Sequence, residues 1–287
     1  MGWQAYQSGM TLNQDTAPVL FDRALLRARL DRARRVGPAA FLLDRVAEDM
    51  ADRLQAVTRE FSDAVDIWTP GTALDEVLRS RCKSIRHVDL GHSETLSLEA
   101  QSLDLAVSAL AFQFVNDLPG VLAQIRRALR PDGLLLAAMI GGDTLTELRQ
   151  SFAAAEAECE GGASPHVAPF ADLRDVGALL QRTGFALPVT DVDQIVVRYD
   201  NVFALMLDLR RMGATNILFE RRRTPTRRAT LLRMAQIYGD ITATLFLPAR
   251  SPFVNRRQPR TWRRHHPRAC RGGRALVSSD HSQGGPS

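Results

Sequence analysis

The sequence predicts an α/β fold: a Rossmann-like, doubly wound domain with a mostly parallel sheet. Two apolar runs, Leu103–Leu110 and Leu134–Ile140, have the composition of strands buried on both faces. Between them, apolar residues recur at helical spacing, and Pro131-Asp132-Gly133 ends the helix in a tight turn. Two buried strands joined by a helix form a right-handed parallel crossover, the unit from which this fold is built.

Two helices are predicted before the sheet. The first begins at Phe21-Asp22-Arg23 and continues to Arg35, where Gly37-Pro38 interrupts it. The second runs from Phe41 to Val57, with its apolar residues on one face. We therefore expect residues 1–60 to form an N-terminal helical cap that packs across the sheet or over the site.

Residues 61–247 are predicted to form the Rossmann-like domain. Its first strand and turn lie at 63–72, followed by a helix from 73 to 78 and a short strand at 84–90. After the crossover, the pattern predicts helices that end near 157, 183, 212 and 238, a strand at 189–199, and a last short strand at 241–247.

Residues 248–287 differ from the rest of the chain. They hold nine arginines and one aspartate, a net of +8, which leaves −3 for residues 1–247 out of a total of +5. The segment is rich in Pro, Gly, Arg and Ser and has few apolar residues, so we expect a disordered tail. Because the folded part is acidic, specific nucleic-acid binding is not expected.

Composition narrows the class of protein. The sequence has no run of about 18 uncharged apolar residues and no secretory signal at its start, so we expect no transmembrane segment. The three cysteines, Cys82, Cys159 and Cys270, lack the spacing of a metal site. A cytoplasmic protein with reduced thiols is the prediction, and no metal centre is expected.

The turn after the first strand is a weak nucleotide-binding motif on its own. In such folds this loop is rich in glycine, because its backbone must approach the ligand closely. Here Asp66 ends the strand, but the loop reads Trp68-Thr69-Pro70-Gly71-Thr72, with a single glycine. Asp89, near the end of the next strand, could bond a ribose hydroxyl or lie in solvent.

Four motifs resemble the class I S-adenosylmethionine-dependent methyltransferase superfamily. The motifs are Val107-Ser108-Ala109-Leu110, Phe114-Val115-Asn116-Asp117-Leu118-Pro119, Leu129-Arg130-Pro131-Asp132-Gly133 and a segment that starts with Gly141-Gly142-Asp143-Thr144-Leu145. The last motif, together with Glu160-Gly161-Gly162-Ala163-Ser164-Pro165-His166, resembles the branch that contains the mitochondrial complex I assembly factor 5 and the BioC-like methyltransferases.

The resemblance implies a seven-stranded sheet, with residues 102–148 as its fourth and fifth strands, and S-adenosylmethionine as cofactor. The final strand is expected to be truncated, because the resemblance stops near residue 247, where we suspect out-of-frame translation. The implied cofactor-binding residues are Asp66, Gly71, Asp89, His92, Ser108 and Leu110. The implied substrate-side residues are Gln113, Asn116, Asp117, Gly142, Asp143 and His166.

The first loop departs from the family pattern, since the family's glycines fall on Trp68, Pro70 and Thr72. Three functions therefore remain open: a methyltransferase acting on a small molecule or a protein, an arginine hydroxylase, and a non-catalytic assembly factor. In the last two, the partner would be a subunit of respiratory complex I.

The substrate-side residues also have ordinary structural interpretations. Asn116 and Asp117 stand where a helix cap is expected, and Gly141-Gly142-Asp143 suits a tight turn as well as a loop facing substrate. His166, in a loop with two prolines, is the best single candidate for substrate contact.

Overall fold

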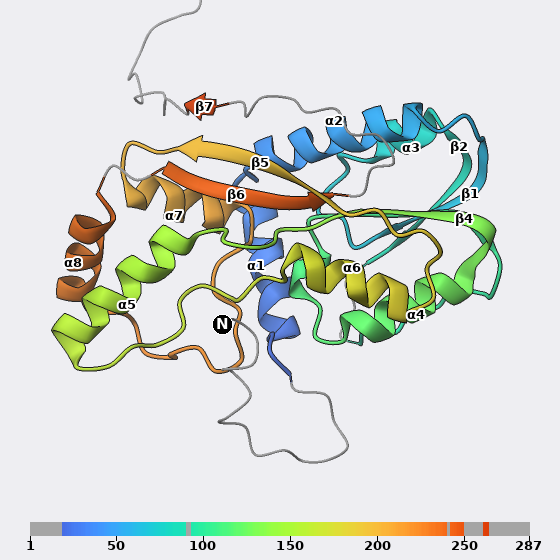
Figure 1. Ribbon diagram of the computed structural model, residues 1–287. Coiled ribbons are helices and arrows are strands. Elements are labelled where there is room, and N and C mark those ends of the chain that lie inside the picture. The colour runs from blue at the N-terminus through green and yellow to red at the C-terminus, as the bar shows by residue number, and fades with distance from the viewer. Residues whose placement is uncertain (1–18, 90–92, 240–241, 250–260, 264–287) are drawn as a thin grey trace, which may run out of the picture.

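A parallel sheet of four strands forms the centre of the computed structural model, which describes residues 19–89, 93–239, 242–249 and 261–263 (Figure 1). The strands lie in the order β2 (Cys82–Val88), β1 (Phe61–Ile67), β3 (Leu103–Ala109) and β4 (Leu129–Ala138). All three neighbouring pairs are parallel. The predicted α/β fold class is therefore confirmed.

The predicted crossover is β3, α4 (Leu118–Ala128) and β4. Every residue of β3 is buried, as expected for a strand covered on both faces. The Asp117 carboxylate accepts a hydrogen bond from the Gly120 N–H and so caps α4, which confirms the capping interpretation of Asp117. The predicted numbering of these two strands was wrong: they are third and fourth in chain order, not fourth and fifth, because the described residues between β1 and β3 form only one strand.

Beyond β4, the strand pairing becomes antiparallel. β5 (Asp191–Arg198) pairs with β6 (Thr242–Ala249) along its whole length, whereas β6 meets β4 at one register position, Ala138 with Ala249. A three-residue strand, β7 (Thr261–Arg263), lies beside β5. The seven-strand count, the truncated last strand and the disordered tail stay predictions, since most of residues 248–287 lie outside the described ranges.

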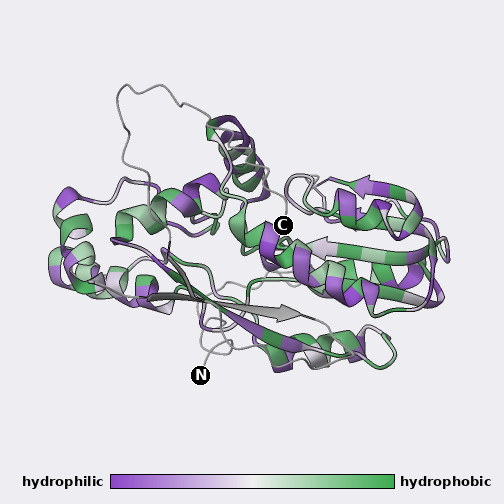
Figure 2. Cartoon of the chain, turned by 90° about the horizontal axis from the view of Figure 1, so that it is seen from above, coloured by the Kyte–Doolittle hydropathy of each residue, from purple (hydrophilic) through white to green (hydrophobic). Residues whose placement is uncertain are grey.

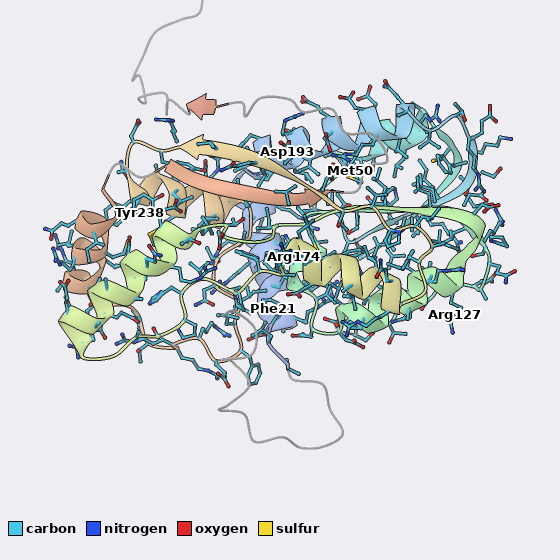
Figure 3. The ribbon with its side chains drawn as sticks, in the orientation of Figure 1. Phe21, Met50, Arg127, Arg174, Asp193 and Tyr238 are labelled. Atoms are coloured by element: carbon cyan, nitrogen blue, oxygen red, sulfur yellow. The ribbon has the colours of Figure 1, made fainter. Side chains whose placement is uncertain are left out.

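Helices cover both faces of the parallel strands (Figure 1). On one face, α2 (Phe41–Gln55) and the short α3 (Asp75–Arg79) pack against β1, β3 and β4, and Figure 3 shows Met50 between α2 and the sheet. On the other face, α4 and α6 (Leu173–Arg182) enclose a second apolar cluster. Helices in Figure 2 carry both green and purple residues, as amphipathic helices on a sheet require.

The other helices pack away from the parallel strands. α5 (Thr146–Glu160), α7 (Val202–Arg211) and α8 (Arg228–Tyr238) share an apolar cluster in which Tyr238 is buried (Figure 3). α1 (Arg23–Val36) contacts α7, and Phe21 and Leu26 pack with Ile217 and Leu218. Of the two predicted cap helices, α2 thus covers the sheet, whereas α1 packs against α7 and the segment that follows α7.

Asp104 on β3 ties three strands together at the amino end of the sheet. Its carboxylate accepts hydrogen bonds from the Ser62 and Asp63 N–H groups of β1 at 3.1 and 3.2 Å. Arg130 of β4 donates to it at 2.9 Å, and Arg59 donates at 3.2 Å. Burial raises the pKa of Asp104, but these hydrogen bonds outweigh it and lower the pKa overall. The ionised carboxylate is therefore part of the folded structure.

Candidate functional site

A small pocket lies where β1 and β2 end, with the loop after β1 as one wall. In open α/β sheets, ligands bind outside the carboxyl ends of the strands, so its place is the expected one. The cavity has a volume of about 200 Å³, below the roughly 300–1,000 Å³ usual for small-molecule sites. It is lined by Asp66, Trp68, Thr69, Gly71, Thr72, Asp75, His87, Val88 and Asp89.

Three titratable side chains meet in this pocket. Asp66, the residue before the last in β1, pairs with His87 in the parallel register, and its Oδ2 lies 3.6 Å from His87 Nδ1. Asp75, the first residue of α3, has its Oδ1 3.8 Å from His87 Nε2. Within the described residues, Asp66 Oδ1 and Asp75 Oδ1 are buried and accept no hydrogen bond. The pocket thus offers two unused acceptors.

Asp66 is the most buried of the three, with 4% of its surface exposed. Burial raises its pKa, although Thr69 and His87 act in the opposite direction. A carboxylate held in such surroundings costs folding free energy unless a ligand compensates its charge. Perturbed groups of this kind are frequent at functional sites.

The loop after β1 is built around a buried tryptophan. Trp68 has a positive φ of 62° and only 6% of its surface exposed. The Arg23 guanidinium lies 4.9 Å from the centre of its ring, and Phe112 meets it edge-on at 6.3 Å. The left-handed conformation there is one that glycine adopts without strain. The backbone of the loop at Trp68 therefore has a conformation that glycine favours, although the residue there carries a buried indole ring.

The structure brings Asp66, Gly71 and Asp89 together as three of the predicted cofactor residues. Ser108 and Leu110 do not line the pocket. Ser108 is fully buried and donates a hydrogen bond to the Ile67 carbonyl at 2.8 Å, which supports the end of β1 from behind. Leu110 packs partly against the α2 side of the sheet. His92 lies outside the described residues.

Asn116 fastens the start of the described chain to the loop before α4. Its Oδ1 accepts from the Leu20 and Phe21 N–H groups at 2.8 and 2.7 Å, and its Nδ2 donates to the Phe21 carbonyl at 3.1 Å. Glu94 accepts from the N–H groups of Asn116 and Asp117. Each predicted substrate-side residue in this loop thus has a structural contact, since Gln113 donates to the Leu110 carbonyl.

Asn116→Ala should lower the free energy of unfolding by about 2 kcal/mol, because it removes three partly buried hydrogen bonds that contribute about 0.5–1.5 kcal/mol each. Chemical denaturation measures the change. Asn201→Ala is the matched control, since Asn201 makes one local capping bond to the Ala204 N–H, worth about 1 kcal/mol. Equal losses in the two variants would contradict the proposed fastening.

The remaining substrate-side residues lie on the loops around α5, apart from the pocket lining. The Gly142 N–H donates to the Ala171 carbonyl at 3.0 Å, and the Asp143 carbonyl accepts from the Thr146 N–H. His166 Nε2 lies 2.7 Å from Glu156 Oε1, and its ring stacks on Phe152 at 3.9 Å. Because Glu156 also accepts from Ser164, this cluster holds the loop that follows α5.

Sequence reasoning did not find the group formed by Asp66, Asp75 and His87. His87 lies in a predicted strand without a cluster of Cys, Asp or Glu at ligand spacing, so no metal centre was expected there. The missing signal was the strand register: parallel pairing places Asp66 opposite His87. The start of α3 then brings Asp75 to the second ring nitrogen.

Comparisons with known proteins converge on one family. The methyltransferase domain model matches residues 46–137. Arginine-hydroxylase NDUFAF5 of Mus musculus is 36% identical over 260 residues, covering 82% of this chain and 76% of the relative. Malonyl-[acyl-carrier protein] O-methyltransferase of Laribacter hongkongensis is 35% identical over 262 residues, covering 79% and 86%. The YcgJ protein of Bacillus subtilis aligns with a TM-score of 0.46 at 10% identity, over 71% of this chain and 95% of that one.

Proposed function

Because the chain belongs to the class I S-adenosylmethionine-dependent methyltransferase superfamily, in the branch of NDUFAF5 and the malonyl-[acyl-carrier protein] O-methyltransferases, we propose that it binds S-adenosylmethionine at the carboxyl ends of β1 and β2 and transfers its methyl group. The observation that carries this proposal is the acidic pocket that contains Asp66, Gly71 and Asp89.

The side chains in the pocket fit this cofactor, which bears a positive sulfonium, an ammonium group and ribose hydroxyls. Asp66 Oδ1 is a buried acceptor without a partner among the described residues, and Asp89 is a second carboxylate beside it in the lining. Carboxylates attract the cation and accept hydrogen bonds from hydroxyl and ammonium groups. The cavity of about 200 Å³ is small for such a ligand, so we infer that the loop at 68–72 widens on binding.

When bound, the cofactor supplies an activated methyl group that a nucleophile displaces in line. Such a transfer depends mainly on positioning and on excluding water, so we assign no general base. The chain's contribution would be to hold the cofactor through Asp66 and Asp89 and to orient the substrate. Among the predicted substrate-side residues, Gln113 supports this role best, because its buried Oε1 accepts no hydrogen bond within the described residues.

Calorimetry and thermal unfolding with S-adenosylmethionine test the proposal. At 100 times its dissociation constant, the cofactor should add about 2.7 kcal/mol to the free energy of unfolding. Asp89→Asn should weaken binding about tenfold, because a charge-assisted hydrogen bond is lost. Glu76→Gln is the control, since Glu76 is exposed on α3 outside the pocket lining. No heat and no shift at millimolar cofactor would reject the proposal.

A second candidate is favoured by the relatives named arginine-hydroxylase. In that case the chain would hydroxylate a protein arginine, or act without catalysis in the assembly of a respiratory NADH dehydrogenase, with a complex I subunit as its partner. Mass spectrometry of the candidate substrate separates the three outcomes, because methylation adds a methyl group, hydroxylation adds an oxygen atom, and assembly alone adds nothing.

The finer architecture belongs to the proposal as well: a seven-stranded sheet with a truncated last strand, a helical segment at 1–60, the methyltransferase-like domain at 61–247 and the tail at 248–287. In the ranges that the structure describes, every helix is too short or too polar to cross a membrane. A cytoplasmic location remains a prediction, to be tested by fractionation.

A further inference from the structure

We propose that Asp66, Asp75 and His87 form a binding site for one divalent first-row transition-metal ion, at the carboxyl ends of β1 and β2. Nothing in the methyltransferase proposal requires this ion. The pocket would then bind a metal ion as a second ligand, whereas the sequence predicted no metal centre.

The geometry of the three side chains carries the proposal. Each offers one donor atom, and the three donors lie within 4.8 Å of one another. Two ligands on opposite sides of one ion are separated by about 4.4 Å at most, since metal–ligand bonds to nitrogen and oxygen are about 2.0–2.2 Å long. Small side-chain rotations therefore suffice to close the site. The residues come from β1, α3 and β2, so the fold itself sets their positions.

The second observation is the unused acceptors. Asp66 is 4% exposed, and its Oδ1 accepts no hydrogen bond within the described residues, nor does Asp75 Oδ1. Buried polar atoms nearly always have a partner, so each exception calls for an explanation. A cation between the two carboxylates would satisfy both oxygens and compensate the buried charge of Asp66. His87 is half exposed and Asp75 partly exposed, which leaves a route from solvent.

The donor types indicate which metal. Carboxylates alone suit Mg²⁺ and Ca²⁺, whereas an imidazole nitrogen shifts the preference toward Mn²⁺, Fe²⁺, Co²⁺ or Zn²⁺. A protonated His87 that bridges both aspartates would be the competing explanation. The distances from the ring nitrogens of His87 to Asp66 and Asp75, 3.6 and 3.8 Å, are longer than hydrogen bonds of about 2.7–3.2 Å. This explanation also leaves the Oδ1 atom of Asp66 unpaired.

Titration of the full chain with Co²⁺, followed by visible absorption, tests the site, with Mn²⁺ calorimetry as a second probe. We expect one ion per chain, and a loss of affinity of at least tenfold in both Asp75→Asn and His87→Gln. Circular dichroism of each variant confirms that it is folded. Glu76→Gln, an exposed carboxylate next to Asp75, should bind as the unchanged chain does.

Two results would overturn the proposal. One is the absence of Co²⁺ binding. The other is binding that persists in His87→Gln but disappears when the two adjacent histidines of the 248–287 segment, His265 and His266, are replaced by asparagine. The outcome is separate from that of the cofactor experiment, because Asp89→Asn should weaken cofactor binding and leave Co²⁺ binding within twofold. Asp66 is common to both sites, so excess Co²⁺ should also reduce the apparent affinity for S-adenosylmethionine.

Discussion

Replacing Asp104 by asparagine should lower the free energy of unfolding by about 3 kcal/mol at neutral pH, because hydrogen bonds to charged groups contribute about 1.5–3 kcal/mol each and only part of that set survives in the amide. Asp104 accepts from two backbone N–H groups of β1 and from two arginines. An amide keeps one oxygen acceptor and presents an NH₂ group to these donors. Urea unfolding measures the loss.

Asp66→Asn is the matched control and should have the opposite sign. Asp66 is also a buried aspartate on a central strand, but burial raises its pKa and one of its oxygens is unpartnered. A neutral amide costs less to bury than a carboxylate. We therefore expect the variant to be more stable than the unchanged chain at neutral pH while its cofactor and metal affinities fall. Destabilisation of both variants would show that Asp66 is a structural residue.

The pH dependence separates the two carboxyls further. For Asp66, whose pKa is raised on folding, the folded state holds the extra proton, so stability falls as pH rises from the ordinary carboxyl pKa through the raised value. For Asp104, whose pKa is lowered, stability is present above the ordinary value and is lost as pH falls through the lowered one. Each asparagine variant should remove its own slope from the plot of stability against pH.

Much of the fold could be predicted because local patterns agree with the tertiary structure. The run at Leu103–Leu110 has the composition of a strand covered on both faces, and β3 is buried throughout. The apolar repeat from Val121 to Ala128 needs only helical geometry to form one face, which α4 buries. The predicted boundaries of the elements agree less well with the structure than their positions do. β4 begins at Leu129 rather than Leu134, because pairing of Leu129 with Leu103 extends the ladder past a register shift.

The candidate site was predictable only in part. Asp66, Gly71 and Asp89 follow from a general rule, since ligands bind where parallel strands end. The positions of Asp75 and His87 depend on strand register and on where α3 begins, which no spacing in the sequence specifies. Asn116 was predicted as a site residue but has a structural role that the sequence could not show, because its three hydrogen bonds reach residues 95 and 96 positions away. Its position before a helix suggested a cap, and the family resemblance suggested a substrate-side role.

Trp68 presents a conflict between backbone and side chain that a pair of substitutions should resolve. Trp68→Ala should lower the free energy of unfolding by about 3–5 kcal/mol, because a large buried aromatic leaves a cavity. Its contacts with Phe112 and Arg23 are lost as well. Chemical denaturation measures this loss, and Phe112→Ala shows how much of it reflects general damage to the same apolar cluster.

Trp68→Gly should be less destabilising than Trp68→Ala, by about 1–2 kcal/mol, because only glycine adopts a φ of +62° without strain. In a strand or a helix glycine is the less stable of the two, so this order of stability would itself demonstrate the left-handed conformation. If the indole also limits the pocket, both variants should bind S-adenosylmethionine more tightly than the unchanged chain. Since Trp68 lines that pocket, unchanged affinity in both variants would mean that the loop widens without moving Trp68. A glycine variant no more stable than the alanine variant would contradict the backbone strain at this position.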